Sequence, residues 1–187
     1  ITLLNGQGGS IEQTYAYLDP KSALNWYTLS NHSAYATQYR ENMPLRPLAA
    51  KILQSAGQPT IDFIALGAGD GKQEVRLLLQ LLELASERGT RAKADISLYL
   101  LDISQPLLSE AYRHASESLT GQNGVTVWAV QGNFHHLPRY TQLHYAPQRA
   151  HRRRLVTMFG YTLGNLDNEP SFFRHCLVGF APGDMLL

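Results

Sequence analysis

The sequence predicts an α/β fold in which an open parallel sheet carries helices on both faces. Short apolar runs, typical of strands buried on both faces, alternate with segments of helical periodicity from residue 60 onward. This alternation favours a parallel sheet with right-handed crossovers. The chain has 187 residues, of which 44% are hydrophobic and 17% charged. That composition is globular, and the chain is long enough to bury a sizeable core.

The part of the chain before the sheet is predicted to be helical. We expect residues 1–58 to form a helical segment that covers the functional site, and residues 59–187 to form the sheet domain. A capping box that begins at Ser10 predicts a short helix, which we expect the pair Asp19-Pro20 to stop. Helices of this kind usually cover another part of the fold.

The strands and helices follow from local patterns. Apolar runs rich in β-branched and aromatic residues predict strands at 60–66, 96–101, 125–130 and 155–159, with the start of a fifth at 183–187. Apolar residues at helical spacing, together with capping residues, prolines and closing glycines, predict helices at 44–57, 75–89, 104–119 and from 168. Because the pattern stops within its fifth strand, we expect an incomplete sheet that belongs to a longer protein.

Charge and cysteine content narrow the functional classes. The chain has 16 Lys and Arg against 15 Asp and Glu, a balance that argues against a nucleic acid or membrane surface bound through bulk charge. The single Cys176 excludes an internal disulfide and fits a reducing compartment. No run reaches the ~20 apolar residues that span a bilayer. We therefore expect a cytoplasmic protein with a small-molecule substrate and no membrane partner. Nothing here predicts the oligomeric state.

The strongest local signal is a glycine-rich turn between the first strand and the next helix, with the sequence Leu66-Gly67-Ala68-Gly69-Asp70-Gly71-Lys72. Glycine permits positive φ and close approach of a ligand, and the helix N-terminus offers free N–H donors. Asp70 stands where a pyrophosphate would bind, which disfavours a dinucleotide and favours a ligand with a sulfonium group, such as S-adenosylmethionine. A tight turn without a ligand is the alternative.

The ends of the next three strands carry the other candidate residues. Asp102 ends the second strand, beside the predicted position of the glycine-rich turn, where a carboxylate can accept both ribose hydroxyls. Asn133 and Phe134 follow the third strand and offer an amide oxygen and a ring for adenine. Each also has a structural alternative. Asp102 can cap the following helix with Ser104, and Asn133-Phe134 can be a polar turn with a core ring.

Together, these strand ends resemble the histidine-specific S-adenosylmethionine-dependent methyltransferases, the type that trimethylates histidine in ergothioneine synthesis. The resemblance rests on the glycine-rich turn, Asp102-Ile103-Ser104, Gly132-Asn133-Phe134 and Gly160-Tyr161-Thr162-Leu163-Gly164-Asn165. Upstream, Trp26-Tyr27 and Pro44-Leu45-Arg46 are also similar to segments of the family. The resemblance implies a Rossmann-like class I methyltransferase fold, of which this chain is the N-terminal part, and S-adenosyl-L-methionine as the cofactor.

The resemblance also implies which residues form the site. The cofactor would be held by Gly67, Ala68, Gly69, Lys72, Asp102, Ile103 and Gly160, with its adenine at Asn133 and Phe134. The amino-acid acceptor would be held by Tyr27, Met43 and Asn165, and Tyr161 or Tyr27 would orient it or relay its proton. Asn133 replaces an aspartate that is usual in the family but keeps a carbonyl acceptor. Met43 replaces a tyrosine, which removes a hydroxyl from the acceptor site; the end of the fourth strand also has the alternative that Asn165 only shapes a turn.

We therefore predict an S-adenosylmethionine-dependent N-methyltransferase that acts on a small acceptor, such as histidine or a derivative, by in-line displacement. Alignment of the methyl donor with a neutral nitrogen lone pair supplies much of the rate in such a reaction. Three alternatives stay open. The first is a non-catalytic cofactor-binding module or inactive fragment, the second a nicotinamide-dependent oxidoreductase, and the third an RNA methyltransferase that uses the arginine run before the fourth strand.

Two further patterns are given structural interpretations. The histidines at 135, 136, 144 and 151 lack the fixed spacing of a metal site, so we predict loop histidines and no metal. The arginines at 149 and 152–154 enter the fourth strand at its amino end, away from the ligand edge of the sheet. We expect them to form a solvated edge.

Overall fold

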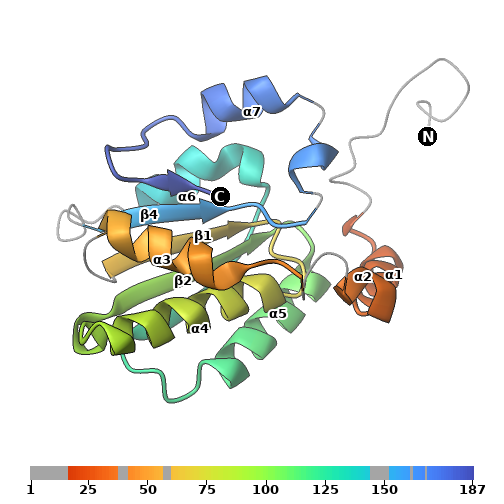
Figure 1. Ribbon diagram of the computed structural model, residues 1–187. Coiled ribbons are helices and arrows are strands. Elements are labelled where there is room, and N and C mark those ends of the chain that lie inside the picture. The colour runs from red at the N-terminus through yellow and green to blue at the C-terminus, as the bar shows by residue number, and fades with distance from the viewer. Residues whose placement is uncertain (1–16, 38–41, 57–59, 144–151, 161, 167) are drawn as a thin grey trace, which may run out of the picture.

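The structure is a computed structural model and describes residues 17–37, 42–56, 60–143, 152–160, 162–166 and 168–187. Its centre is a five-stranded sheet in the order β3-β2-β1-β4-β5, and neighbouring strands of this sheet are parallel (Figure 1). The strands are β1 (Thr60–Leu66), β2 (Asp95–Asp102), β3 (Val125–Gln131), β4 (Arg153–Thr157) and β5 (Met185–Leu186). The predicted α/β class is confirmed.

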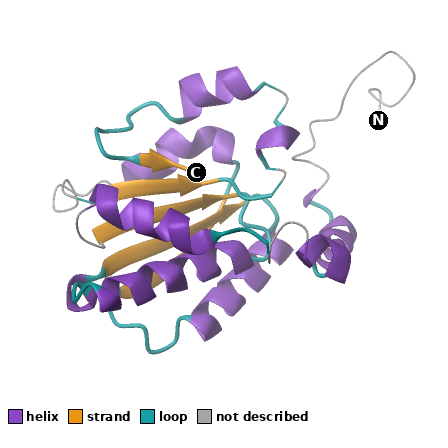
Figure 2. Cartoon of the chain, in the orientation of Figure 1, coloured by secondary structure: helices purple, strands orange, loops and turns teal. Residues whose placement is uncertain are grey.

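Helices lie on both faces of this sheet (Figure 2). The helices are α1 (Pro20–Ser30), α2 (Ser33–Ala36), α3 (Leu45–Ala56), α4 (Lys72–Glu87), α5 (Gln105–Ser118), α6 (Leu137–Leu143) and α7 (Glu169–Cys176). Short 3₁₀ turns occur at Arg91–Lys93, Phe134–His136 and Leu163–Asn165. Helices α3, α4 and α5 cover one face, and α6 and α7 cover the other (Figure 1).

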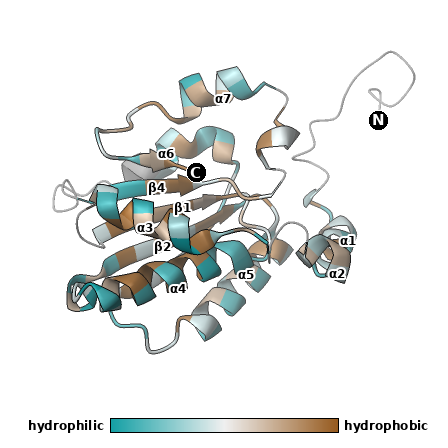
Figure 3. Cartoon of the chain, in the orientation of Figure 1, coloured by the Kyte–Doolittle hydropathy of each residue, from teal (hydrophilic) through white to brown (hydrophobic). Residues whose placement is uncertain are grey.

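The hydrophobic core is divided by the sheet into two clusters. One joins side chains of α3, α4 and α5 to alternate residues of the strands, such as Phe63 and Leu98, and the other joins Leu66 to Leu137 and Phe172 of α6 and α7. In Figure 3, the brown of hydrophobic residues is found on the strands and on parts of α4. The chain changes face after β3, so the strand order reverses between β1 and β4. In open α/β sheets, ligands bind at the carboxyl ends of the strands at such a point.

Helix α1 begins where the sequence predicted a helix to stop. Asp19 is its N-cap and accepts a hydrogen bond from the Ser22 backbone N–H at 3.0 Å, and Pro20 is the first helical residue. The prediction was wrong because Asp-Pro is also a good helix start: the carboxylate satisfies a free N–H, and proline has no N–H to satisfy. The helix predicted from Ser10 lies outside the described residues. Helix α6 was not predicted.

The fourth strand lies two residues earlier than predicted. Arg152, just before it, and Arg154 within it have buried side chains, whereas Arg153 is exposed as predicted. The Arg152 and Arg154 side chains are 7% and 8% exposed. Arg152 Nε donates to Asp62 at 2.7 Å, and Arg154 Nε donates to Asp184 at 2.8 Å. These ion pairs compensate the burial of charge at the amino ends of the strands. Within the part of the chain that is described, no helix is long and apolar enough to cross a membrane.

Candidate functional site

The glycine-rich turn lies directly against the end of β2. Gly67, Gly69 and Gly71 adopt φ values of 64°, 56° and 69°, a region that glycine enters without strain. The backbone N–H groups of Gly67 and Ala68 both donate to the Leu101 carbonyl, at 2.9 and 3.3 Å. The turn thus joins β1 to α4 while its backbone stays fixed to the neighbouring strand.

Asp102 connects the turn to the start of α5. Its carboxylate accepts from the Gly69 backbone N–H at 3.0 Å and from the Ser104 backbone N–H at 2.8 Å, and the residue is 6% exposed. Both predicted arrangements therefore occur together: Asp102 faces the turn, and it also helps to start α5. Each carboxylate oxygen has two lone pairs, so these bonds leave acceptor capacity at the end of β2.

Burial raises the pKa of the Asp102 carboxyl group, because the charged form loses its hydration. Hydrogen bonds from the backbone N–H groups of Ser104, Gly69 and Ile103 act in the opposite direction and lower this pKa. The group is therefore a carboxylate that is held in place by amides but is easier to protonate than an exposed aspartate. A further donor to its oxygens would favour the charged form.

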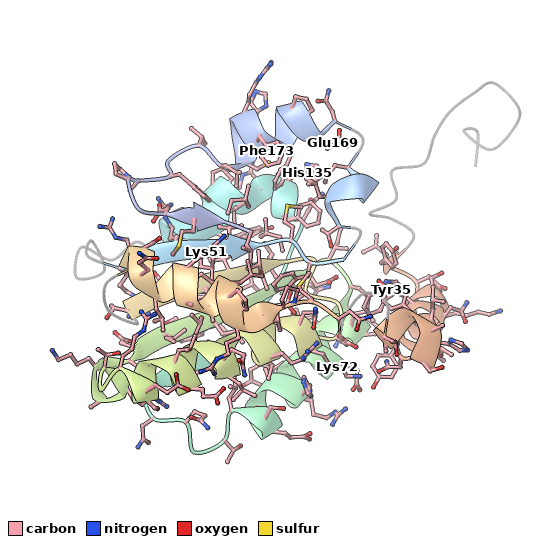
Figure 4. The ribbon with its side chains drawn as sticks, in the orientation of Figure 1. Tyr35, Lys51, Lys72, His135, Glu169 and Phe173 are labelled. Carbon is pink, nitrogen blue, oxygen red and sulfur yellow. The ribbon has the colours of Figure 1, made fainter. Side chains whose placement is uncertain are left out.

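Lys72, the first residue of α4, faces α1. Its Nζ donates to Asn31 Oδ1, lies 5.7 Å from the centre of the Tyr27 ring and is 3.5 Å from Asp70 Oδ2. Asp70 is buried, and its other oxygen accepts from the Lys72 backbone N–H at 3.3 Å. Asp70 is therefore partly neutralised by Lys72. Figure 4 labels Lys72 and Tyr35, which lie toward the end of the molecule where α1 and α2 are found.

Trp26 of α1 packs onto the turn itself. A Cβ atom added at Gly69 would lie 2.5 Å from the Trp26 ring, so residue 69 has to be glycine for α1 to sit where it does. In the sequence, Trp26 stands out only as part of the aromatic pair Trp26-Tyr27. Its contact with Gly69 was not predictable from that pair, because the position of α1 depends on packing between distant segments.

The end of β3 forms the predicted turn. Asn133 caps the short 3₁₀ turn that follows and accepts from the His135 backbone N–H at 2.9 Å. The Phe134 ring lies 3.7 Å from the position of a Cβ atom at Gly67 and meets the Phe172 ring edge-on at 5.9 Å. Asn133 thus has the turn-forming contact of its structural alternative, while Phe134 reaches the glycine-rich turn from the other core cluster.

The end of β4 faces both the turn and α2. A Cβ atom at Gly67 would lie 3.0 Å from the Thr162 methyl group, and one at Gly160, where φ is 71°, would lie 3.7 Å from the Tyr35 hydroxyl. Neither Thr162 nor Tyr35 was assigned a role from the sequence. Tyr161 lies outside the described residues, and Asn165 ends the 3₁₀ turn that follows.

Met43 has a different neighbour from the other predicted acceptor residues. Its sulfur accepts from Gln73 Nε2 at 3.6 Å, and its side chain packs against the core cluster of α3 and α4. The structure therefore places Met43 beside the first turn of α4.

Two buried hydroxyls lie at the same edge of the sheet. Ser104 Oγ and Thr157 Oγ1 have no hydrogen-bond partner among the described residues. Ser104 follows β2, and Thr157 is the last residue of β4, on the other side of β1. Buried hydroxyls without a partner are uncommon, because their lost hydration is not replaced. Their position is consistent with a polar ligand at this edge.

The remaining candidates have structural roles. The Cys176 thiol donates to the His135 carbonyl at 3.2 Å, and burial raises the pKa of this thiol, so Cys176 is a buried structural residue. In the described ranges, no three His, Cys, Asp or Glu residues form a group that would hold a metal ion. His144, His151 and Arg149 lie outside those ranges.

Comparison with known proteins identifies a family. Residues 2–187 match the family described as histidine-specific methyltransferase, SAM-dependent. No curated protein is similar enough to count as a match. The match extends over almost the whole chain and includes all the strand ends described above.

Solved structures show the same fold. A protein from Methanococcus maripaludis, assigned provisionally to the S-adenosyl-L-methionine-dependent methyltransferases, aligns with a TM-score of 0.54 at 20% identity, covering 97% of this chain and 67% of that one. YjhP of E. coli aligns with a TM-score of 0.45 at 16% identity, covering 81% and 52%. This chain therefore spans about two thirds of the first protein and about half of the second. The first similarity supports the fold, and the second is too low to support an argument.

Proposed function

The chain belongs to the histidine-specific, S-adenosylmethionine-dependent methyltransferase family, and from this premise we propose that it methylates a nitrogen atom of histidine or of another small amino-acid acceptor. The observation that carries the proposal is the hydrogen bond between Gly69 and Asp102 at the switch point of the sheet. It brings the glycine-rich turn and a carboxylate together at the edge where ligands bind in this fold. A cytoplasmic location is part of the same proposal.

The residues at this edge fit the cofactor. The Phe134 ring lies beside Gly67, 3.7 Å from the position of a Cβ atom there, and we assign its face to the flat adenine group. Asp102 has acceptor capacity for ribose hydroxyls. The N-terminus of α4 and the Lys72 ammonium favour a carboxylate, through free N–H groups and positive charge. We assign these four residues to cofactor binding.

S-adenosylmethionine, when bound, supplies a methyl group on a sulfonium: the acceptor nitrogen forms the new C–N bond as the C–S bond breaks, and sulfur keeps the electron pair. The task of the protein is then to orient a neutral nitrogen and to exclude water. We assign the acceptor to the end of β4, beside Gly160 and the Tyr35 hydroxyl, with Tyr161 and Asn165 from the same segment. Tyr27, whose ring faces Lys72, is assigned to holding that ammonium.

Calorimetry and a transfer assay test the proposal together. We expect S-adenosylhomocysteine to bind the chain and the Asp102→Ala variant to bind it at least about tenfold more weakly, because hydrogen bonds to a charged group contribute roughly 1.5–3 kcal/mol. The Asp95→Ala variant is the matched control, since Asp95 lies at the opposite end of β2. Binding of NADH in preference to S-adenosylhomocysteine would reject the proposal.

The transfer assay separates an enzyme from a binding module. Labelled S-adenosylmethionine is incubated with L-histidine and with each other amino acid in turn, and methylated products are identified by mass spectrometry. Methyl transfer to an amino acid supports the proposed function. Cofactor binding without transfer to any of them, in this chain and in a longer form of the protein, supports a non-catalytic module.

The RNA methyltransferase alternative rests on the arginines at 149 and 152–154. Arg152 and Arg154 are held in ion pairs with Asp62 and Asp184, Arg153 is exposed, and Arg149 lies outside the described residues, so this alternative keeps less support than the amino-acid acceptor.

A further inference from the structure

Asn31 lies just after α1 and bonds in two directions. Its Nδ2 donates to the Tyr27 carbonyl at 2.7 Å, and its backbone N–H donates to the same carbonyl at 3.1 Å, so Asn31 is fixed to the last turn of α1. Its Oδ1 accepts from Lys72 Nζ at the start of α4. Among side chains of this size, an amide offers a donor and an acceptor at once without titrating. Asn31 therefore links the end of one helix to the beginning of another.

The position of the Lys72 ammonium depends on α1. Two of its neighbours, the Asn31 amide and the Tyr27 ring, belong to the same segment, and the third is Asp70 of the glycine-rich turn. Lysine has a long side chain that loses much rotamer freedom when it is held in one place. The Lys72 side chain is 31% exposed, so its ammonium is held by neighbours while part of the side chain stays accessible.

The same segment places Trp26 on the turn. The Trp26 ring contacts Gly69 closely enough to exclude a Cβ atom there. Helix α1 thus meets the predicted cofactor site at three points, through the Trp26 ring on Gly69 and through the Asn31 amide and the Tyr27 ring on Lys72. Because one helix carries these contacts, we expect the loss of one to weaken the others.

We propose that Asn31 is a positioning residue, which holds the Lys72 ammonium at the N-terminus of α4 and couples the packing of Trp26 against Gly69 to cofactor binding. This goes beyond the assignment of Lys72 to the cofactor. The proposed role of Asn31 rests on the proposed function only where cofactor affinity is measured. The packing of Trp26 against Gly69 can be measured without a ligand. A charge that is held in place before binding costs less to order when the ligand arrives.

Tryptophan fluorescence tests whether Asn31 keeps the Trp26 ring packed against Gly69. The chain has two tryptophans, and the Trp128→Phe variant leaves Trp26 as the sole reporter. In that background we expect Asn31→Leu to shift the Trp26 emission to longer wavelength, because the ring leaves Gly69 for water. Asn31→Asp keeps an acceptor oxygen for Lys72 and is expected to retain the parent emission. Asn123→Leu, at an exposed position before β3, is the matched control.

Cofactor affinity gives the second measurement. We expect Asn31→Leu to weaken binding of S-adenosylhomocysteine about three- to tenfold, less than a buried charged hydrogen bond because the site is partly exposed. In a double-mutant cycle with Lys72→Met, the double variant should bind no more weakly than Lys72→Met alone, since both changes remove the same interaction. Circular dichroism tests whether each variant is folded. If Asn31→Leu is unfolded, the milder substitution Asn31→Ser replaces it.

The outcomes are separable. Unchanged Trp26 emission in Asn31→Leu, or additive losses in the cycle, would overturn the positioning role even if the cofactor binds. If the parent chain does not bind S-adenosylhomocysteine but Asn31→Leu still shifts the Trp26 emission, the role of Asn31 in keeping Trp26 packed against Gly69 is supported. The coupling of this contact to the cofactor is then rejected together with the proposed function.

Discussion

At the scale of single residues, the site combines a buried carboxylate with backbone amides. Asp102 accepts from Gly69 and Ser104 and is almost fully buried. Burial raises its pKa, and hydrogen-bond donors lower it again. Because a bound ribose would add two more donors, the protonation of Asp102 and the occupancy of the site should be linked.

The first prediction concerns the pH dependence of cofactor binding. The neutral acid persists to higher pH in the folded chain than in the unfolded one, so Asp102 favours the folded state below its unfolded pKa, and this contribution is lost as pH rises through the raised pKa. Ligand hydroxyls prefer the carboxylate. Affinity for S-adenosylhomocysteine should therefore increase with pH up to the raised pKa and then level off.

Calorimetry from about pH 5 to about pH 8, in two buffers of different ionisation enthalpy, measures the affinity and the released protons. The Asp102→Asn variant should bind more weakly, and its binding should neither strengthen with pH nor release protons. Equal pH dependence in the wild type and in Asp102→Asn would assign the titration to another group.

The second prediction concerns Tyr35. Removal of its hydroxyl in Tyr35→Phe should lower kcat/KM for L-histidine about tenfold, the size of one hydrogen bond to a charged substrate group, and should leave the Kd of S-adenosylhomocysteine unchanged. Tyr112→Phe is the control, because Tyr112 is 44% exposed on α5. Equal kcat/KM in Tyr35→Phe and the wild type would remove Tyr35 from the acceptor site.

At the scale of elements, ion pairs between distant segments set the ends of the strands. Arg154 at the start of β4 bonds to Asp184, just before β5, with its backbone N–H and with its guanidinium. Their side chains are 8% and 2% exposed. A pair buried this deeply adds little net stability over apolar residues, but loss of one partner leaves the other charge uncompensated.

The third prediction follows from that asymmetry. Asp184→Ala should lower the free energy of unfolding by about 3–5 kcal/mol, because Arg154 would be left buried without a carboxylate. Asp95→Ala removes the partner of Arg152 that is 67% exposed and should cost less than about 1 kcal/mol, since Asp62 remains. Urea denaturation measures both variants. Similar losses in the two would show that burial is not the deciding factor.

At the scale of the whole molecule, the sheet brings the candidate residues to one edge from six separate segments. They come from α1 and α2, the glycine-rich turn, and the ends of β2, β3 and β4. Binding of a ligand to such an edge should stabilise the entire fold, because those segments must stay together for the site to exist.

The fourth prediction is therefore a thermal shift. At a concentration of about 100 times its Kd, S-adenosylhomocysteine should add about 2.7 kcal/mol and raise the Tm by about 5–10 °C. The Asp102→Ala variant at the same ligand concentration should show a clearly smaller shift, and NADH should cause none with the wild type. Equal shifts in the wild type and in Asp102→Ala would place the ligand away from β2.

Much of the fold was predictable because buried segments have apolar patterns that can be recognised within a few residues. β1 was predicted with its observed bounds, since a strand covered on both faces is a continuous apolar run ended by turn residues. β4 was displaced by two residues, because the buried Arg152 and Arg154 look like surface residues until their carboxylate partners are known. The start of α1 was missed because Asp-Pro can end one helix or begin another.

Local residue patterns were enough to predict the alternation of the five strands with α3, α4, α5 and α7, the glycine-rich turn and the carboxylate at the next strand end, since each depends on residue types within one short segment. The contacts of Trp26 with Gly69, of Lys72 with Asn31 and of the Tyr35 hydroxyl with Gly160 became visible only in the folded chain. Those contacts depend on how α1 and α2 pack against strand ends far along the chain, and no local pattern records the direction in which a helix approaches a sheet.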